Sequence, residues 1–184
     1  MILQVKPAAA YSRIAEDFLR ECRKLDAKFP PEGWTKEDLR AAANEILDYY
    51  ETGNGKSWPV SFCLIALGYT ASPEDIDRIL IYEEKMPQTV LLSLDSVSNP
   101  KAIECLLRHA TPEHGERELA YRGLGKINFE LLDEPDKWHA KIKERLTSSL
   151  KKEKAAWLSK MIIKSLDKIE ASAIKAHKKK DKQS

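Results

Sequence analysis

The chain has 184 residues, of which 42% are hydrophobic and 33% charged, with 31 Lys and Arg against 29 Asp and Glu. This composition excludes a disordered chain, and the length suits one domain with a continuous core. No apolar run approaches the roughly 20 residues that a membrane-spanning helix needs. The first residues lack the apolar region of a signal peptide, so we expect a cytoplasmic protein. Three cysteines at wide spacing favour buried, reduced thiols over disulfides.

Two amphipathic helices are predicted in the first part of the chain. Residues 8–28 carry apolar side chains at helical spacing, until Pro30-Pro31 ends the pattern. Thr35, with Asp38 three residues later, resembles a capping box and therefore marks the start of a second helix.

The middle of the chain repeats one pattern with a shift of 27 residues. Each copy is an apolar helix, a short polar turn and a second helix that begins with proline. Ser72 and Asn99 end the turns and are suitable N-caps, and proline loses no hydrogen bond at the first helical position. Apolar residues then recur at spacings that place them on one helix face. Matching positions in the two copies are Leu64 and Leu91, Ile65 and Leu92, Leu67 and Leu94, Pro73 and Pro100, Ile76 and Ile103, and Leu80 and Leu107.

This pattern resembles the HEAT family of α-helical repeats, in particular the short bacterial type with Leu-Gly before the turn. The likeness extends from Pro59 to about Leu150 and includes a degraded third copy, with an insertion around residues 129–135. The resemblance implies stacked helical hairpins, because a single hairpin cannot bury its apolar face. We therefore predict an all-α solenoid of about eight or nine helices, without a sheet. We predict one helical-repeat domain over residues 1–176 and a basic flexible tail over residues 177–184.

Two further helices are predicted after the repeats, over residues 136–150 and 151–176. The second has an apolar stripe at helical spacing, which consists of Leu158, Ile162, Leu166, Ile169 and Ala173.

Charge is distributed unevenly along the chain. Residues 1–136 hold 16 Lys and Arg against 24 acids, whereas residues 137–184 hold 15 against 5. The lysine-rich end could hold phosphates, or it could be a solubilising cap on the last repeat. Trp138 and Trp157 lie among these lysines, and we expect both to pack between the last two helices, with base stacking as the alternative. The candidate residues for nucleic-acid binding are Lys151, Lys152, Trp157, Lys160, Lys164 and Lys168.

No catalytic signature occurs in the sequence, so we expect neither enzyme activity nor a cofactor. The histidines form no pair at the spacing of a zinc-binding helix, and no Cys-x-x-Cys occurs, so no metal site is predicted. His109 and His114 could approach one another and Cys105, but we expect the histidines to lie on the surface.

The second helices of stacked hairpins usually line a concave surface where partners bind. We predict that the outward positions of these helices combine acids with Tyr, His and Arg, a mixture typical of protein interfaces. These candidate partner-binding residues are Asp75, Asp77, Arg78, Tyr82, Glu104, Arg108 and His109. We therefore expect a non-enzymatic protein-binding module with a basic protein partner. A narrower hypothesis is an inhibitor or immunity-type protein that neutralises a basic bacterial toxin. The alternative is a nucleic-acid-binding helical-repeat protein that uses the lysine-rich C-terminal helix.

Overall fold

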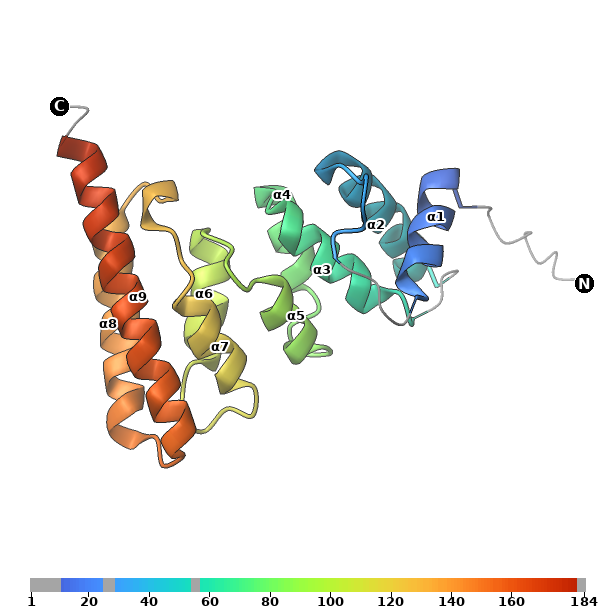
Figure 1. Cartoon of the computed structure of the whole chain (residues 1–184). Helices are drawn as coiled ribbons and strands as arrows, with labels where there is room; N and C mark the ends of the chain where they lie inside the picture. The colour runs from blue at the N-terminus through green and yellow to red at the C-terminus, as the bar shows by residue number, and fades with distance from the viewer. Residues whose placement is uncertain (1–10, 25–28, 54–56, 182–184) are drawn as a thin grey trace, which may run out of the picture. The chain divides into compact units, whose positions relative to one another are not determined.

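The computed structural model describes residues 11–24, 29–53 and 57–181, and every regular element in these ranges is helical (Figure 1). The described residues form nine α-helices and one short 3-10 helix without a strand, which confirms the all-α class. The chain divides into two compact units, residues 1–70 and 71–184, which are described separately. The boundary lies between the two helices of the first repeat copy, and the single domain over residues 1–176 stays a prediction.

The first unit contains α1 (Arg13–Cys22), α2 (Lys36–Glu51) and α3 (Val60–Thr70), and α2 contacts both neighbours. The predicted capping box is confirmed. Thr35 Oγ1 accepts a hydrogen bond from the Asp38 N–H at 3.1 Å, and the Asp38 carboxylate accepts one from the Thr35 N–H at 3.1 Å. Helix α1 is shorter than the predicted segment, of which residues 8–10 and 25–28 lie outside the described residues. The fully buried side chains of this unit include Phe18, Leu39, Ile46, Leu47 and Leu64.

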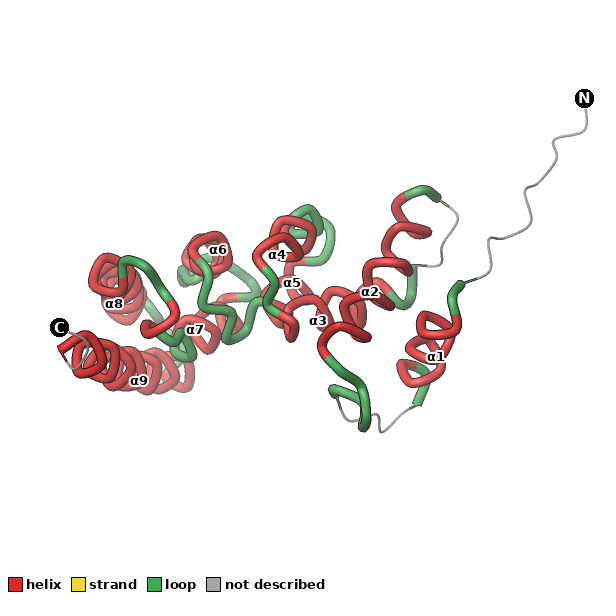
Figure 2. Tube along the Cα trace, turned by 90° about the horizontal axis from the view of Figure 1, so that it is seen from above, coloured by secondary structure: helices red, strands yellow, loops and turns green. Residues whose placement is uncertain are grey.

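The helices of the second unit lie in two rows (Figure 2). One row contains α4 (Pro73–Leu80), α6 (Pro100–His109) and α8 (Pro135–Lys152). The other row contains α5 (Pro87–Ser93), α7 (Arg117–Leu124) and α9 (Ala156–Asp181). The 3-10 helix η1 (Phe129–Leu131) connects α7 to α8. Helices α4, α5, α6 and α8 begin with proline, where its missing N–H has no partner to lose.

The predicted starts of α4 and α6 agree with the structure. Ser72 and Asn99 are the N-cap residues, and Asn99 Oδ1 accepts a hydrogen bond from the Lys101 N–H at 2.9 Å. The apolar positions after each proline are Ile76 and Ile103, and both are buried. Local sequence therefore defines the start and the buried face of both helices.

The two C-terminal helices differ from the prediction mainly at their ends. Helix α9 begins at Ala156 rather than at residue 151 and continues to Asp181, so much of the predicted tail is helical. Residues 182–184 lie outside the described residues. No helix in the described ranges is both long and apolar enough to cross a bilayer. In the predicted stripe of α9, Leu166 is half-buried, and the buried members are Leu158, Ile162, Ile169 and Ala173.

Serine side chains connect α9 to the end of α7. Ser165 Oγ donates a hydrogen bond to the Tyr121 carbonyl at 2.9 Å, and Ser172 Oγ donates one to the Ile127 carbonyl at 3.0 Å. These contacts require close approach of the two backbones. A Cβ atom added at Gly125 would lie 2.9 Å from the Ser165 Cα, closer than real Cβ contacts. Glycine at this position thus allows α9 to pack against α7.

Candidate functional site

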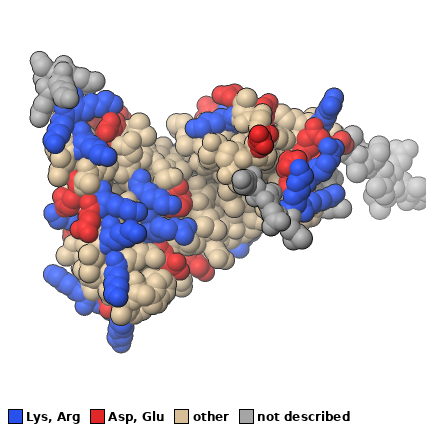
Figure 3. Space-filling model, viewed as in Figure 1, with Lys and Arg blue, Asp and Glu red and all other residues tan. Residues whose placement is uncertain are grey.

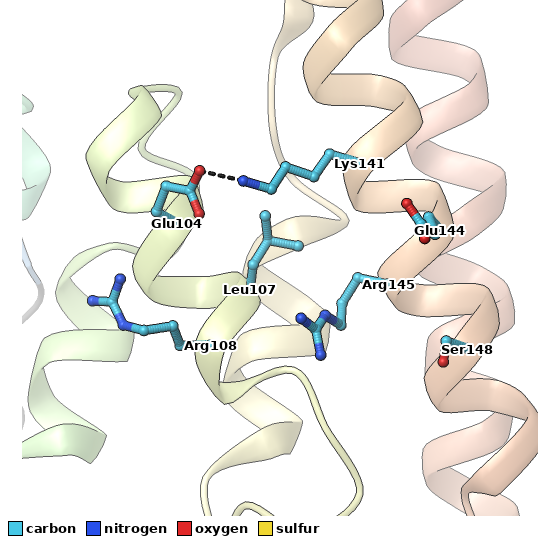
Figure 4. Close-up of a pocket in the computed structure, with 7 residues that line it drawn as sticks. All are labelled: Glu104, Leu107, Arg108, Lys141, Glu144, Arg145 and Ser148. Carbon is cyan, nitrogen blue, oxygen red and sulfur yellow. Dashed lines mark hydrogen bonds and ion pairs between the residues drawn. The ribbon is translucent and has the colours of Figure 1, made fainter.

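A groove of about 480 Å³ lies between α6 and α8 in the second unit (Figure 4). Lys141 and Arg145 extend from α8 toward α6, where Leu107 lies beside them (Figure 4). The Lys141 ammonium pairs with the Glu104 carboxylate across the groove. Charged side chains of both signs therefore surround one apolar residue. The lining residues are Glu104, Leu107, Arg108, Lys141, Glu144, Arg145 and Ser148.

Two charged residues of this groove remain available to a partner. Arg145 and Glu144 make no hydrogen bond or ion pair within the described residues, and both are exposed. Arg145 presents a planar guanidinium with five N–H donors, which suits recognition of a carboxylate.

Other acids on the α4 and α6 row already have cationic partners. Asp77 pairs with the Lys101 ammonium at 2.6 Å. Glu83 accepts two hydrogen bonds from Arg108, at 3.1 Å from Nε and at 2.5 Å from Nη2. Burial alone would raise the pKa of Glu83, but the hydrogen bonds from Arg108 and His109 outweigh it and lower the pKa below its ordinary value. This surface is therefore less acidic toward a partner than the sequence indicates.

The structure supports outward positions for only some of the predicted partner-binding residues. The side chains of Asp77, Glu104 and Arg108 are exposed by 58%, 42% and 54%. Arg78 is half-buried. The expected outward position is wrong for three residues, because Asp75, Tyr82 and His109 are only 3%, 4% and 7% exposed. Their role in partner binding stays a prediction.

The helix ends explain the misplacement of Tyr82 and His109. Helix α4 ends at Leu80, so Tyr82 lies in the following turn, where its N–H donates to the Ile79 carbonyl at 3.1 Å. Helix α6 continues to His109, and the loop after it brings the His114 ring to 4.5 Å from the His109 ring. Tyr82 and His109, which the 27-residue shift relates, therefore have different surroundings.

The basic surface of α9 is exposed as the nucleic-acid alternative requires. Figure 3 shows Lys and Arg gathered over α9 on the face of the second unit that is in view. The expectation that Trp157 packs between helices is wrong, because Trp157 is 55% exposed, whereas Trp138 is buried at 7%. Three of the candidate lysines, Lys160, Lys164 and Lys168, make no ion pair within the described residues. All five candidate lysines are exposed, namely Lys151, Lys152, Lys160, Lys164 and Lys168.

A second hollow, of about 590 Å³, lies beside α9. Lys126, Lys168 and Lys175 line it together with Asn128 and one acid, Glu130. The excess of lysines favours an anion in this position over a cation.

A cluster of three different metal-ligand types lies behind Arg108. The Glu83 carboxylate, the Cys105 thiol and the His109 ring place one ligand atom each within 4.8 Å of the others. His109 Nε2 is 3.1 Å from Glu83 Oε1, and His109 Nδ1 is buried without a hydrogen-bond partner among the described residues. Burial raises the pKa of the Cys105 thiol to about 12, so the thiol is protonated.

The sequence suggested that His109 and His114 could approach Cys105, but it gave no reason to add Glu83, so this cluster was not predicted. Cys105 and His109 are one helical turn apart, a spacing that places both side chains on one face of α6. Glu83 follows α4 and reaches them only through the packing of α4 against α6, which no local pattern reveals.

Comparison of the chain with protein-family models, with curated proteins and with solved structures gave no match. Function is therefore inferred from the side chains and their geometry.

Proposed function

We propose that this chain is a non-enzymatic protein-binding module built from HEAT-like helical repeats, and that it binds its partner in the groove between α6 and α8. One observation carries the proposal: Arg145 and Glu144 line this groove without a partner of their own within the described residues. Arginine is enriched at interface hot spots. Leu107 is only 3% exposed, so the surface that the groove offers to a partner is mainly polar.

Two features support the repeat architecture. The 27-residue shift relates helices of like amphipathic pattern, and helices of the second unit lie in two rows as stacked hairpins would (Figure 2). In such stacks one row of helices commonly presents the binding surface. Glu104 and Arg108, which the sequence analysis selected, lie on α6 in the row that borders the groove.

The charges in the groove favour a partner segment that carries both signs of charge. Arg145 suits a carboxylate and Glu144 suits a cation, because neither has an ion-pair partner among the described residues. A strongly basic partner is less suited to this surface, since Lys141 already pairs with Glu104 and Arg108 already pairs with Glu83. We therefore propose a protein-binding module rather than the narrower toxin inhibitor.

The test is capture of the partner with the full-length chain, followed by affinity measurements on two variants. Arg145→Glu should weaken binding at least about 30-fold, as loss of an interface hot spot worth about 2 kcal/mol does. Lys151→Glu, on the same helix but outside the groove, is the matched control and should change affinity less than about threefold. Equal affinity of Arg145→Glu and wild type for the captured protein would refute the groove as its binding site.

Nucleic-acid binding is a second candidate. The exposure of Trp157, near lysines that make no ion pair within the described residues, favours it. Exposed Trp can stack on bases, and a row of lysines can follow a phosphate backbone.

We expect binding to duplex DNA or RNA only at low salt, because a lysine-rich helix attracts phosphates whatever its function. Fluorescence anisotropy across a salt series measures this. Trp157→Ala should leave the affinity unchanged, whereas a stacked base would cost about 1–3 kcal/mol. Tight binding near physiological salt that Lys160→Glu with Lys164→Glu abolishes, in a protein with an unchanged circular dichroism spectrum, would make this second candidate the better one.

A further inference from the structure

We infer that Glu83, Cys105 and His109 form a binding site for a divalent cation of intermediate softness, of which Zn²⁺ is the best match. This inference does not depend on the proposed binding of a partner in the groove between α6 and α8. Carboxylate oxygen, thiolate sulfur and imidazole nitrogen are the three ligand types that Zn²⁺ takes in proteins. All three come from the second unit, on α6 and on the turn that follows α4.

The distances suit a small cation. The three ligand atoms lie within 4.8 Å of one another. Bonds of about 2.0–2.3 Å in a tetrahedral site separate the ligands by about 3.3–3.8 Å. Side-chain rotations that move the ligand atoms by about an ångström would therefore bring them to these separations, without movement of the helices. Cys105 and His109 lie one helical turn apart on α6, and Glu83 Oε1 is already 3.1 Å from His109 Nε2.

One tautomer of the His109 ring makes a repulsive contact with Glu83 that a cation would relieve. If Nε2 carries the proton and donates it to Glu83, the buried Nδ1 keeps a lone pair without a donor. If Nδ1 carries the proton, the lone pair of Nε2 faces a carboxylate oxygen at 3.1 Å. A cation between the ring and Glu83 removes that repulsion. Such a cation would bind Nε2, and Nδ1 would keep the proton.

Arg108 does not block the site. It donates one hydrogen bond to each oxygen of Glu83, and a carboxylate has about four lone-pair sites. Carboxylates that bind metals are commonly held by hydrogen bonds from a second residue. Arg108 would thus orient Glu83, whose Oε1 also lies 3.1 Å from His109 Nε2.

Binding would replace the thiol proton of Cys105, which passes to water as the sulfur becomes a thiolate ligand. The fourth position falls to His114 or to a water molecule. The centroid of the exposed His114 ring lies 4.5 Å from that of His109, which makes His114 the candidate among the side chains near His109.

The experiment is titration of the chelator-treated, full-length protein with Co²⁺, whose thiolate complexes absorb in the near ultraviolet. We expect one equivalent to produce the thiolate band and Zn²⁺ to displace it. Cys105→Ser should abolish the band and His109→Gln should weaken binding more than tenfold. Cys22→Ser, which changes a thiol of the first unit, is the matched control and should leave the titration unchanged.

Zn²⁺ should also raise the thermal midpoint of the wild-type protein and of Cys22→Ser, but not that of His109→Gln. His114→Gln separates the two choices for the fourth ligand, because only a bound His114 makes that variant weaker. Glu83→Gln provides a further variant if Cys105→Ser does not fold. Absence of the thiolate band in the wild type, or its persistence in Cys105→Ser, would overturn the inference.

Discussion

Replacement of Phe129 by alanine is expected to destabilise the second unit by about 3–5 kcal/mol, the cost of removing a buried phenyl ring from a core. Phe129 is fully buried in η1, and its ring meets the His139 ring edge-on at 5.5 Å between centroids. Its N–H also donates to Ser172 Oγ of α9 at 3.3 Å. Loss of the ring leaves a cavity where η1 contacts both α8 and α9. Urea unfolding followed by far-ultraviolet circular dichroism measures the change.

Leu131, in the same short helix, provides the matched control. Its side chain is 69% exposed, so Leu131→Ala should change the free energy of unfolding by no more than about 0.5 kcal/mol. Equal effects of the two substitutions would mean that η1 does not contribute to the core and that residues 129–135 are a simple surface insertion.

Gly125→Ala is expected to destabilise the second unit. Overpacking of a core costs about 1–3 kcal/mol, and we expect a loss of at least this size. The added methyl would lie 2.6 Å from Ser165 Oγ and 2.9 Å from the Ser165 Cα. The side chain could rotate, but the backbone atom can move only if α9 shifts away from α7. Such a shift would also lengthen the hydrogen bond from Ser165 to the Tyr121 carbonyl, which is 2.9 Å in the native structure.

Gly115→Ala serves as its control, because a Cβ atom at Gly115 meets no atom within 4 Å. We expect its stability to match that of the wild type or to exceed it slightly, since alanine restricts the unfolded chain. A Gly125→Ala protein as stable as Gly115→Ala would contradict the close packing of α7 and α9.

Local signals in the sequence predicted the starts of helices well. A cap and a first-turn proline act within a few residues, so Thr35 before α2 and Asn99 before α6 could be identified without knowledge of the fold. The apolar stripe of α9 is local in the same sense, and Ile162 and Ile169 are buried as its period predicts.

Burial at helix ends could not be predicted, because it depends on segments distant in sequence. The repeat equates Tyr82 with His109, yet one lies in a turn and the other ends a helix, and both are buried. For Trp157 the error is the reverse, because this residue was expected to pack between helices, yet it lies near the start of α9 and is exposed.

The candidate sites depend on contacts between elements and were predicted only in part. Glu104 and Arg108 were selected from α6, whereas Lys141 and Arg145 of α8 were not selected, although the repeat pattern extends to about Leu150. The pairing of Glu104 with Lys141 also changes the charge that a partner would meet. The residue types on α6 alone therefore predict a partner-binding surface. The net charge of that surface also depends on side chains of the neighbouring helix, α8.

Amine footprinting of the chain with its captured partner tests the proposed binding surface most directly. Lys141 lies in the groove with 46% of its side chain exposed, whereas Lys160 and Lys164 lie exposed on α9. Acetylation of each lysine, read by mass spectrometry with and without the partner, compares the two surfaces in one sample. We predict that the partner protects Lys141 and leaves Lys160 and Lys164 as reactive as in the free chain. Protection of Lys160 and Lys164 with Lys141 unchanged would contradict binding in the groove and place the interface on α9.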